Sequence, residues 1–83
     1  MKIQLSDTER EILKKYYDAV IRVGRSGGFQ GLTIMIYEAT NATGELELTD
    51  AQLGRVVRYI ISYGPGGFQD SFLRRVFRRV LRL

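Results

Sequence analysis

A four-residue sequence, Gly-Gly-Phe-Gln, occurs twice in this chain of 83 residues, at positions 27–30 and 66–69. The apolar residues of 13–24 also match those of 53–64 at a constant offset of 40. Because the match continues through the flanks of both copies, it indicates an internal duplication rather than a short coincidence. A duplicated chain of this length is restricted to folds in which both copies form the same structure and share one core.

The duplication extends to the start of each copy, where residues 3–7 match 46–50 at an offset of 43. The three-residue difference between the two offsets is close to one helical turn, so the apolar face of a helix stays in phase. We therefore predict a single domain, 1–83, made of two helical hairpins that correspond to residues 1–43 and 44–83. The expected architecture is mainly α, with four helices and pseudo-twofold symmetry.

Two short segments, 2–5 and 45–48, alternate polar and apolar residues, as strands with one buried face do. These segments either pair as a minimal two-stranded β ladder or act as extended lead-ins whose leucines pack on the core. Each is followed by a capping-box sequence, at 6–9 and 49–52, in which Ser or Thr and Glu or Gln satisfy each other's backbone donors. Helices are therefore expected to begin directly after both segments.

The spacing of apolar residues predicts the helices themselves. The first is expected over 7–23 and the third over 50–63, each with one apolar stripe. In the segment 32–39 the β-branched residues favour a strand, whereas the duplication and an apolar face favour a helix, and we predict a helix. The last helix is expected over 70–83. The inward-facing residues of the first and third helices are expected to be Ile12, Leu13, Tyr16, Ala19, Val20, Val23, Leu53, Val56, Val57, Ile60 and Ile61.

Both Gly-Gly-Phe-Gln sequences are predicted to be structural turns between the helices of a hairpin. Gly24 and Gly64 would end the preceding helices in the left-handed conformation, and the glycine pair would allow a tight reversal. The functional alternative is an anion cradle at the following helix, but the Lys and Ser/Thr of a P-loop are missing. The predicted turn residues are Gly27, Gly28, Phe29, Gln30, Gly66, Gly67, Phe68 and Gln69.

The predicted last helix separates a basic face from an apolar one. At about 100° per residue its five arginines fall within about 140° of arc, and Asp70 is its only acidic residue. Arginine favours bidentate contacts with phosphate or carboxylate more than lysine does. The alternative is a solvated surface, with some arginines bridged to acidic residues of other elements. The predicted polyanion-binding residues are Arg55, Arg58, Arg74, Arg75, Arg78, Arg79 and Arg82.

The composition excludes several classes of site. The chain has no Cys and no His, which removes disulfides, the usual soft metal ligands and the commonest general base. No acid–base or nucleophile pair has the spacing of a catalytic site, so we expect neither an enzyme nor a cofactor. No apolar run reaches the roughly 20 residues that span a bilayer, and no secretory signal is present, so we expect a cytoplasmic protein without membrane contact.

The positive charge lies in the second half of the chain. The net charge is +4, and residues 48–83 carry seven Arg against two Asp. We predict a non-catalytic binding module that contacts nucleic acid, a nucleoprotein or an acidic protein through the Arg-rich last helix. The alternative is a small homo-oligomeric adaptor or inhibitor protein, with a homodimer interface of tyrosines and C-terminal leucines. The candidates for that interface are Tyr16, Tyr17, Tyr37, Tyr59, Tyr63, Leu81 and Leu83.

Overall fold

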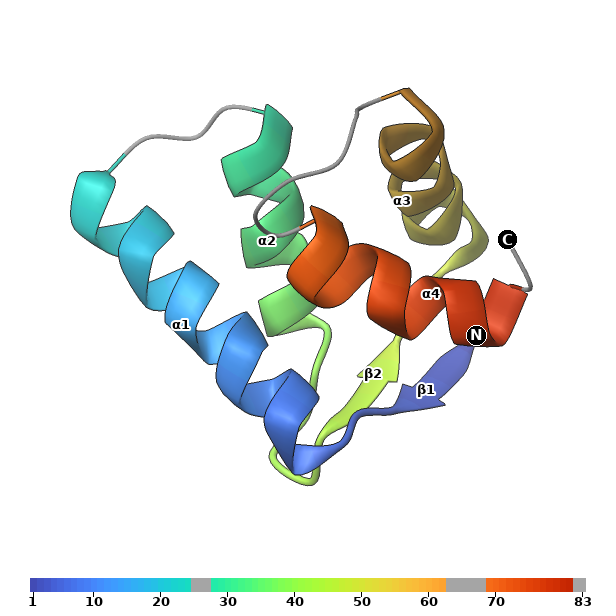
Figure 1. The fold of residues 1–83 in the computed structure, drawn as a ribbon, viewed down its shortest axis with the longest axis horizontal. Helices are drawn as coiled ribbons and strands as arrows, with labels where there is room; N and C mark the ends of the chain where they lie inside the picture. The colour runs from blue at the N-terminus through green and yellow to red at the C-terminus, as the bar shows by residue number, and fades with distance from the viewer. Residues whose placement is uncertain (25–27, 63–68, 82–83) are drawn as a thin grey trace.

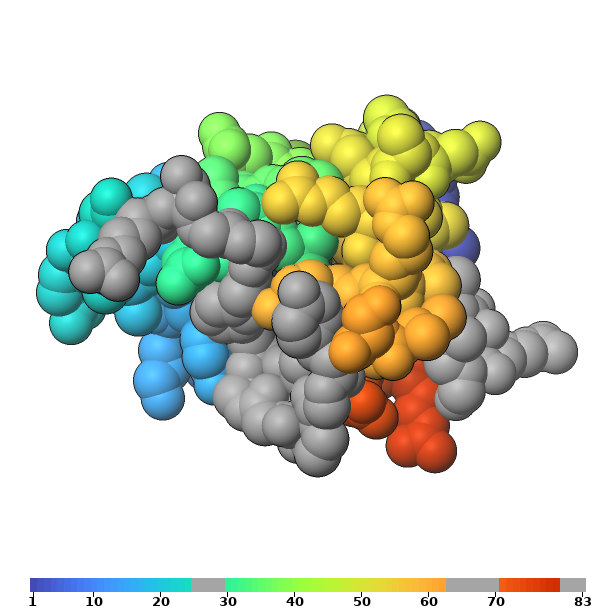
Figure 2. All heavy atoms as spheres, turned by 90° about the horizontal axis from the view of Figure 1, so that it is seen from above, coloured from blue at the N-terminus to red at the C-terminus, as the bar shows by residue number. Residues whose placement is uncertain are grey.

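The computed structural model (Figure 1) describes residues 1–24, 28–62 and 69–81. The fold is mainly helical, as predicted, and it contains a small antiparallel sheet. Seen from above, α1 and α3 lie at opposite ends of the molecule, with α2 between them (Figure 2). In chain order the elements are β1 (Lys2–Gln4), α1 (Asp7–Val23), α2 (Gly28–Glu38), β2 (Glu45–Glu47), α3 (Asp50–Ser62), the π-helical segment η1 (Gln69–Leu73) and α4 (Arg74–Leu81).

The two short alternating segments pair as a ladder rather than serving as separate lead-ins. Strands β1 and β2 are antiparallel, with Ile3 opposite Leu46 at the centre of the register. A two-stranded ribbon is marginal on its own, but both central side chains are buried in the core. Packing against the helices therefore stabilises this small sheet.

The register of the ladder is the one that a twofold axis through its central pair requires. Leu48 N–H donates to the Met1 carbonyl at 2.9 Å, and Leu5 N–H donates to the Gly44 carbonyl at 2.9 Å. With the offset of 43 found in the sequence, a twofold rotation exchanges these two hydrogen bonds. The duplication of the whole chain, and the symmetry of the two hairpins, stay predictions.

Both predicted helix starts have the expected capping boxes. Glu9 N–H donates to Ser6 Oγ at 3.2 Å, and Ser6 N–H donates to Glu9 Oε1 at 2.8 Å. The same reciprocal bonds join Thr49 and Gln52, at 3.2 and 2.9 Å. At the other end of α1, Gly24 has a φ of 72° and caps the helix in the left-handed conformation. Local hydrogen bonding thus defines where these helices begin and where α1 ends.

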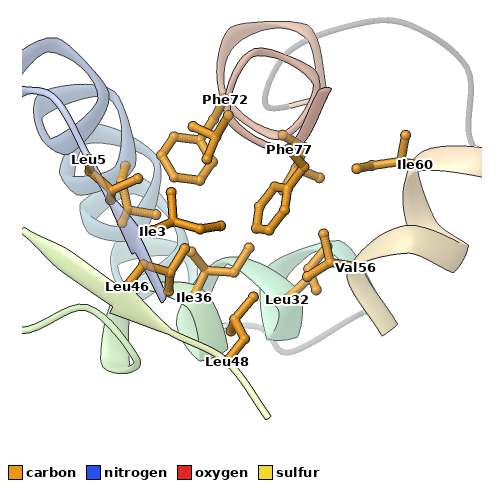
Figure 3. Packing of buried hydrophobic residues seen from close by; sticks show 13 residues of the cluster. Ile3, Leu5, Leu32, Ile36, Leu46, Leu48, Val56, Ile60, Phe72 and Phe77 are labelled. Carbon is orange, nitrogen blue, oxygen red and sulfur yellow. The ribbon is translucent and has the colours of Figure 1, made fainter. Parts of the chain in front are cut away.

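Helix α4 and segment η1 close the core. Phe72 and Phe77 point from them toward the strands and α2, beside Ile3 and Ile36 (Figure 3). The predicted apolar face of the last helix is therefore confirmed, because its described apolar residues have no exposed surface. The buried cluster consists of Ile3, Leu5, Leu13, Leu32, Ile36, Leu46, Leu48, Val56, Ile60, Phe72, Leu73, Val76 and Phe77.

Three residues predicted to face inward are exposed. Val23 and Ile61 are 63% and 74% exposed, and Ala19 is exposed as well. Val23 lies in the last turn of α1, which projects away from the other helices in Figure 1. Ile61 lies in the last turn of α3. Helical periodicity places a side chain on a stripe, but burial also requires a neighbouring element opposite that turn.

The predicted turn between the first two helices is too long. Gly28, Phe29 and Gln30 form the first turn of α2, where glycine is accepted because the first backbone N–H groups of a helix have no intrahelical partner. Gln69 likewise begins η1. The other predicted turn residues, and the side chains of Phe29 and Gln69, lie outside the described part of the chain. The helix predicted over 32–39 is confirmed as part of α2.

Candidate polyanion-binding groove

The basic face of α4 follows from the way its apolar residues alternate with arginine pairs. Two arginines, two apolar residues and two more arginines run from position 74 to 79. Because Val76 and Phe77 are completely buried, the helical period directs the arginines on either side of them to the outer surface. The core therefore orients the basic side chains.

Four of the predicted residues lie together. Arg74, Arg75, Arg78 and Arg79 line a surface groove of about 520 Å³, which we call the arginine groove. It covers about 7.5 Å of helix axis at 1.5 Å per residue, so it is long enough to contact a few phosphate groups. Guanidinium groups donate up to five N–H bonds each and accept none. The chemistry of the groove thus favours an anionic ligand rich in acceptor oxygens.

A buried carboxylate anchors one end of the groove. Arg79 Nη1 lies 3.0 Å from Glu9 Oε2, and Arg79 Nη2 donates to Glu9 Oε1 at 3.4 Å. The Glu9 side chain is 1% exposed, whereas the Arg79 side chain is 52% exposed. Burial by itself would raise the pKa of Glu9, but the Ser6 N–H bond and the bonds and charge of Arg79 together lower it. Arg79 is therefore held in place while half of its surface faces solvent.

The other arginines of the groove differ in their exposure. Arg75 and Arg78 are exposed, and within residues 1–24, 28–62 and 69–81 neither forms a salt bridge. Arg74 is half-buried. The predicted pair between Asp70 and Arg74 stays a prediction, because the Asp70 side chain is outside the described part. Arg75 and Arg78 are thus the two groove residues most available to an added anion.

The remaining predicted arginines are not part of the groove. Arg55 lies against α2, where its Nη1 is 4.0 Å from Met35 Sδ. Its Nη2 is 3.0 Å from the point at which a Cβ would stand if Gly31 carried a side chain. Arg58 is exposed on α3 and does not line the groove. Arg82 lies outside the described residues. The structure thus brings the described arginines of α4 together in one groove and leaves the two arginines of α3 outside it.

Sequence reasoning missed a second cavity, which lies between α1 and the segment that follows α2. Its volume is also about 520 Å³, and it brings acidic and basic side chains of α1 together with Tyr37 and Asn41. No charge pattern in the sequence pointed to this cavity, because the acidic and basic residues on the outer face of α1 balance each other. With carboxylates and cations on the same wall, this cavity favours no single charge class of ligand. The charged residues that line it are Asp7, Arg10, Glu11 and Lys14.

The tyrosines proposed for a protein interface are partly used within the fold. Tyr17 and Tyr37 stack on each other, with ring centroids 3.8 Å apart and an angle of 11° between the rings. Tyr16 and Tyr59 are half-buried and pack against the core. Tyr63 and Leu83, and the side chain of Leu81, lie outside the described residues. The four described tyrosines therefore form no continuous exposed surface for the predicted protein interface.

The described residues hold neither a metal-binding cluster nor a membrane-spanning helix. They contain no group of three or more acidic side chains that could hold a metal ion. No helix among them is long and apolar enough to cross a membrane. In comparisons with protein-family models, curated proteins and solved structures, nothing matches this chain.

Proposed function

We propose that this protein is a non-catalytic binding module that contacts nucleic acid or a nucleoprotein through the arginine groove of α4. The observation that carries the proposal is the shared groove itself, which within the described part of the chain is lined by four arginines. Arginine suits phosphate because its planar fork donates two parallel hydrogen bonds. Arg75 and Arg78 can do so at once, since both are exposed and neither has an acidic partner in the described ranges.

The groove supports recognition of the phosphate backbone rather than of bases. The described lining side chains are guanidinium donors, so the groove matches phosphate oxygens on any sequence. The excess of positive charge in residues 48–83 adds long-range attraction to a polyanion. Binding is therefore expected to tolerate changes of sequence and to weaken strongly with salt.

The test is fluorescence anisotropy of labelled duplex and single-stranded oligonucleotides at increasing salt concentration. If the groove neutralises about two to four phosphates, the log–log salt slope on duplex DNA is about −2 to −4. The double variant Arg75→Gln/Arg78→Gln should flatten that slope by about 2, because two phosphate contacts are lost. Glutamine is a comparable helix former, so α4 should remain folded.

A matched control removes the same charge elsewhere. Lys15 and Arg22 are exposed on α1, so Lys15→Gln/Arg22→Gln lowers the net charge equally without touching the groove. This control should keep the wild-type slope. Wild-type protein that does not bind at low salt, or a control that loses as much affinity as the groove variant, would refute the proposal.

A further inference from the structure

The outer face of α3 carries a glycine that no contact within the described residues explains. Gly54 lies inside α3, where glycine is the least favourable residue after proline. Its conformation is helical, unlike the left-handed Gly24 and Gly44. A Cβ built on Gly54 would meet no described atom within 4 Å. Neither backbone geometry nor packing within the described part of the chain accounts for this residue.

Gly54 is half-buried, and its surroundings form a partly exposed surface of mixed character. Val57 is half-buried, and Ile61 is 74% exposed. Asp50 and Arg58 are both exposed, one four residues before the glycine and the other four residues after it. At about 100° per residue all of them fall within about 100° of arc around Gly54. The atoms of α3, coloured yellow to orange in Figure 2, lie at the surface of the molecule.

The spacing of these charges makes the face complementary to itself. When two copies of α3 cross antiparallel at Gly54, Asp50 of each copy faces Arg58 of the other. Because opposite charges stand at equal distances from the glycine, a twofold axis produces two identical ion pairs. The missing Cβ lets the two backbones approach closely at the crossing point. Val57 and the nearby apolar surface are then covered by the first turns of the second helix.

We infer that the outer face of α3 is a self-association surface on which a second copy of this chain packs its own α3, with Gly54 against Gly54 and two reciprocal Asp50–Arg58 ion pairs. The reciprocal spacing is what identifies the partner as a second copy, since an unrelated partner would not require it. Association also suits a domain with a small core, because it buries additional apolar surface. This surface shares no residue with the arginine groove. Either proposal can therefore fail without the other.

The test is sedimentation velocity of the full chain across the micromolar range. The wild-type protein should change from monomer to dimer as its concentration rises. Gly54→Lys should remain monomeric, because its side chain enters space that is open in one copy but blocked by the second copy. Lysine is a better helix former than glycine, so the variant should keep its circular dichroism spectrum and its fold.

A charge swap tests the register of the interface. In the Arg58→Asp variant, Asp50 of each copy faces a second acid on the other copy. This repulsion should raise the dissociation constant of the dimer at least about tenfold. The double variant Asp50→Arg/Arg58→Asp restores opposite charges at both ends and should recover dimer formation. Arg75→Gln/Arg78→Gln, on the separate groove, should dimerise like the wild type. A wild-type monomer at all concentrations, a dimeric Gly54→Lys, or a charge swap no better than Arg58→Asp would overturn the inference.

Discussion

The ion pair between Glu9 and Arg79 predicts an asymmetric response to mutation. Its carboxylate is 1% exposed and its guanidinium side chain is 52% exposed. Arg79→Met keeps much of the aliphatic stem but leaves a buried carboxylate without its counter-charge. Glu9→Gln leaves a guanidinium that can turn into solvent. Removing the more exposed partner should therefore destabilise the fold more than neutralising the buried one.

The structure sets the size of both effects. For Arg79→Met we expect a loss of about 2–4 kcal/mol in the free energy of unfolding at pH 7, near the cost of breaking a buried pair. The value stays below the upper limit because Ser6 N–H still donates to the Glu9 carboxylate at 2.8 Å. For Glu9→Gln we expect about 1 kcal/mol, since the amide oxygen can still accept that capping-box bond.

The assay is urea unfolding followed by circular dichroism, arranged as a double-mutant cycle. Combined with Glu9→Gln, the change Arg79→Met no longer isolates a buried charge, so the double variant should be more stable than Arg79→Met alone. Each kcal/mol corresponds to about 4–8 °C in Tm for a domain of this size, which makes the differences measurable by heating as well. Additive losses, or an Arg79→Met variant as stable as Glu9→Gln, would refute the reasoning.

The pH dependence gives an independent check on the same pair. Folding lowers the pKa of Glu9 from its ordinary value of 4.5. The associated stabilisation is therefore present above pH 4.5 and is lost as the pH falls through the lowered pKa. In Arg79→Met the counter-charge is gone, and burial should keep the pKa of Glu9 higher. The stability difference between wild type and Arg79→Met should accordingly shrink on acidification, and a difference constant with pH would contradict this account.

Two further predictions concern the fold. Gly44→Ala should cost about 2 kcal/mol or more, since Gly44 has a φ of 84° and the new Cβ would lie 2.7 Å from Arg10 Cδ. Gly24→Ala, with a φ of 72° in open space, should cost only about 1 kcal/mol, and equal losses in Tm would contradict the difference. Phe77→Ala should cost about 3–5 kcal/mol because the ring is fully buried. The adjacent Arg78→Gln should change stability by less than about 0.5 kcal/mol, and similar urea midpoints for these two variants would argue against the core described above.

Local signals predicted the helix starts because the interactions that define them span only a few residues. The hydrogen bonds between Ser6 and Glu9 join residues three apart, so the sequence contains the whole interaction. The apolar face of the last helix was predictable for a similar reason, because a helical period repeats within one turn. Burial at the helix ends could not be predicted in this way, because Val23 and Ile61 lie on the apolar stripes and are nevertheless exposed. It depends on whether another element packs opposite the last turn.

The helical class, the capped helix starts and the arginine face of α4 were predictable from the sequence, because each depends on residues close together in the chain. Which of the predicted arginines lie in one groove depends instead on long-range packing. Glu9 and Arg79 are 70 positions apart, and local patterns assigned Glu9 to a capping box and Arg79 to an open basic face. They meet because closure of the core brings α4 over the start of α1. The same packing places Arg55 against α2. The periodicity of α3 could not predict this contact, because the contact is with a different helix.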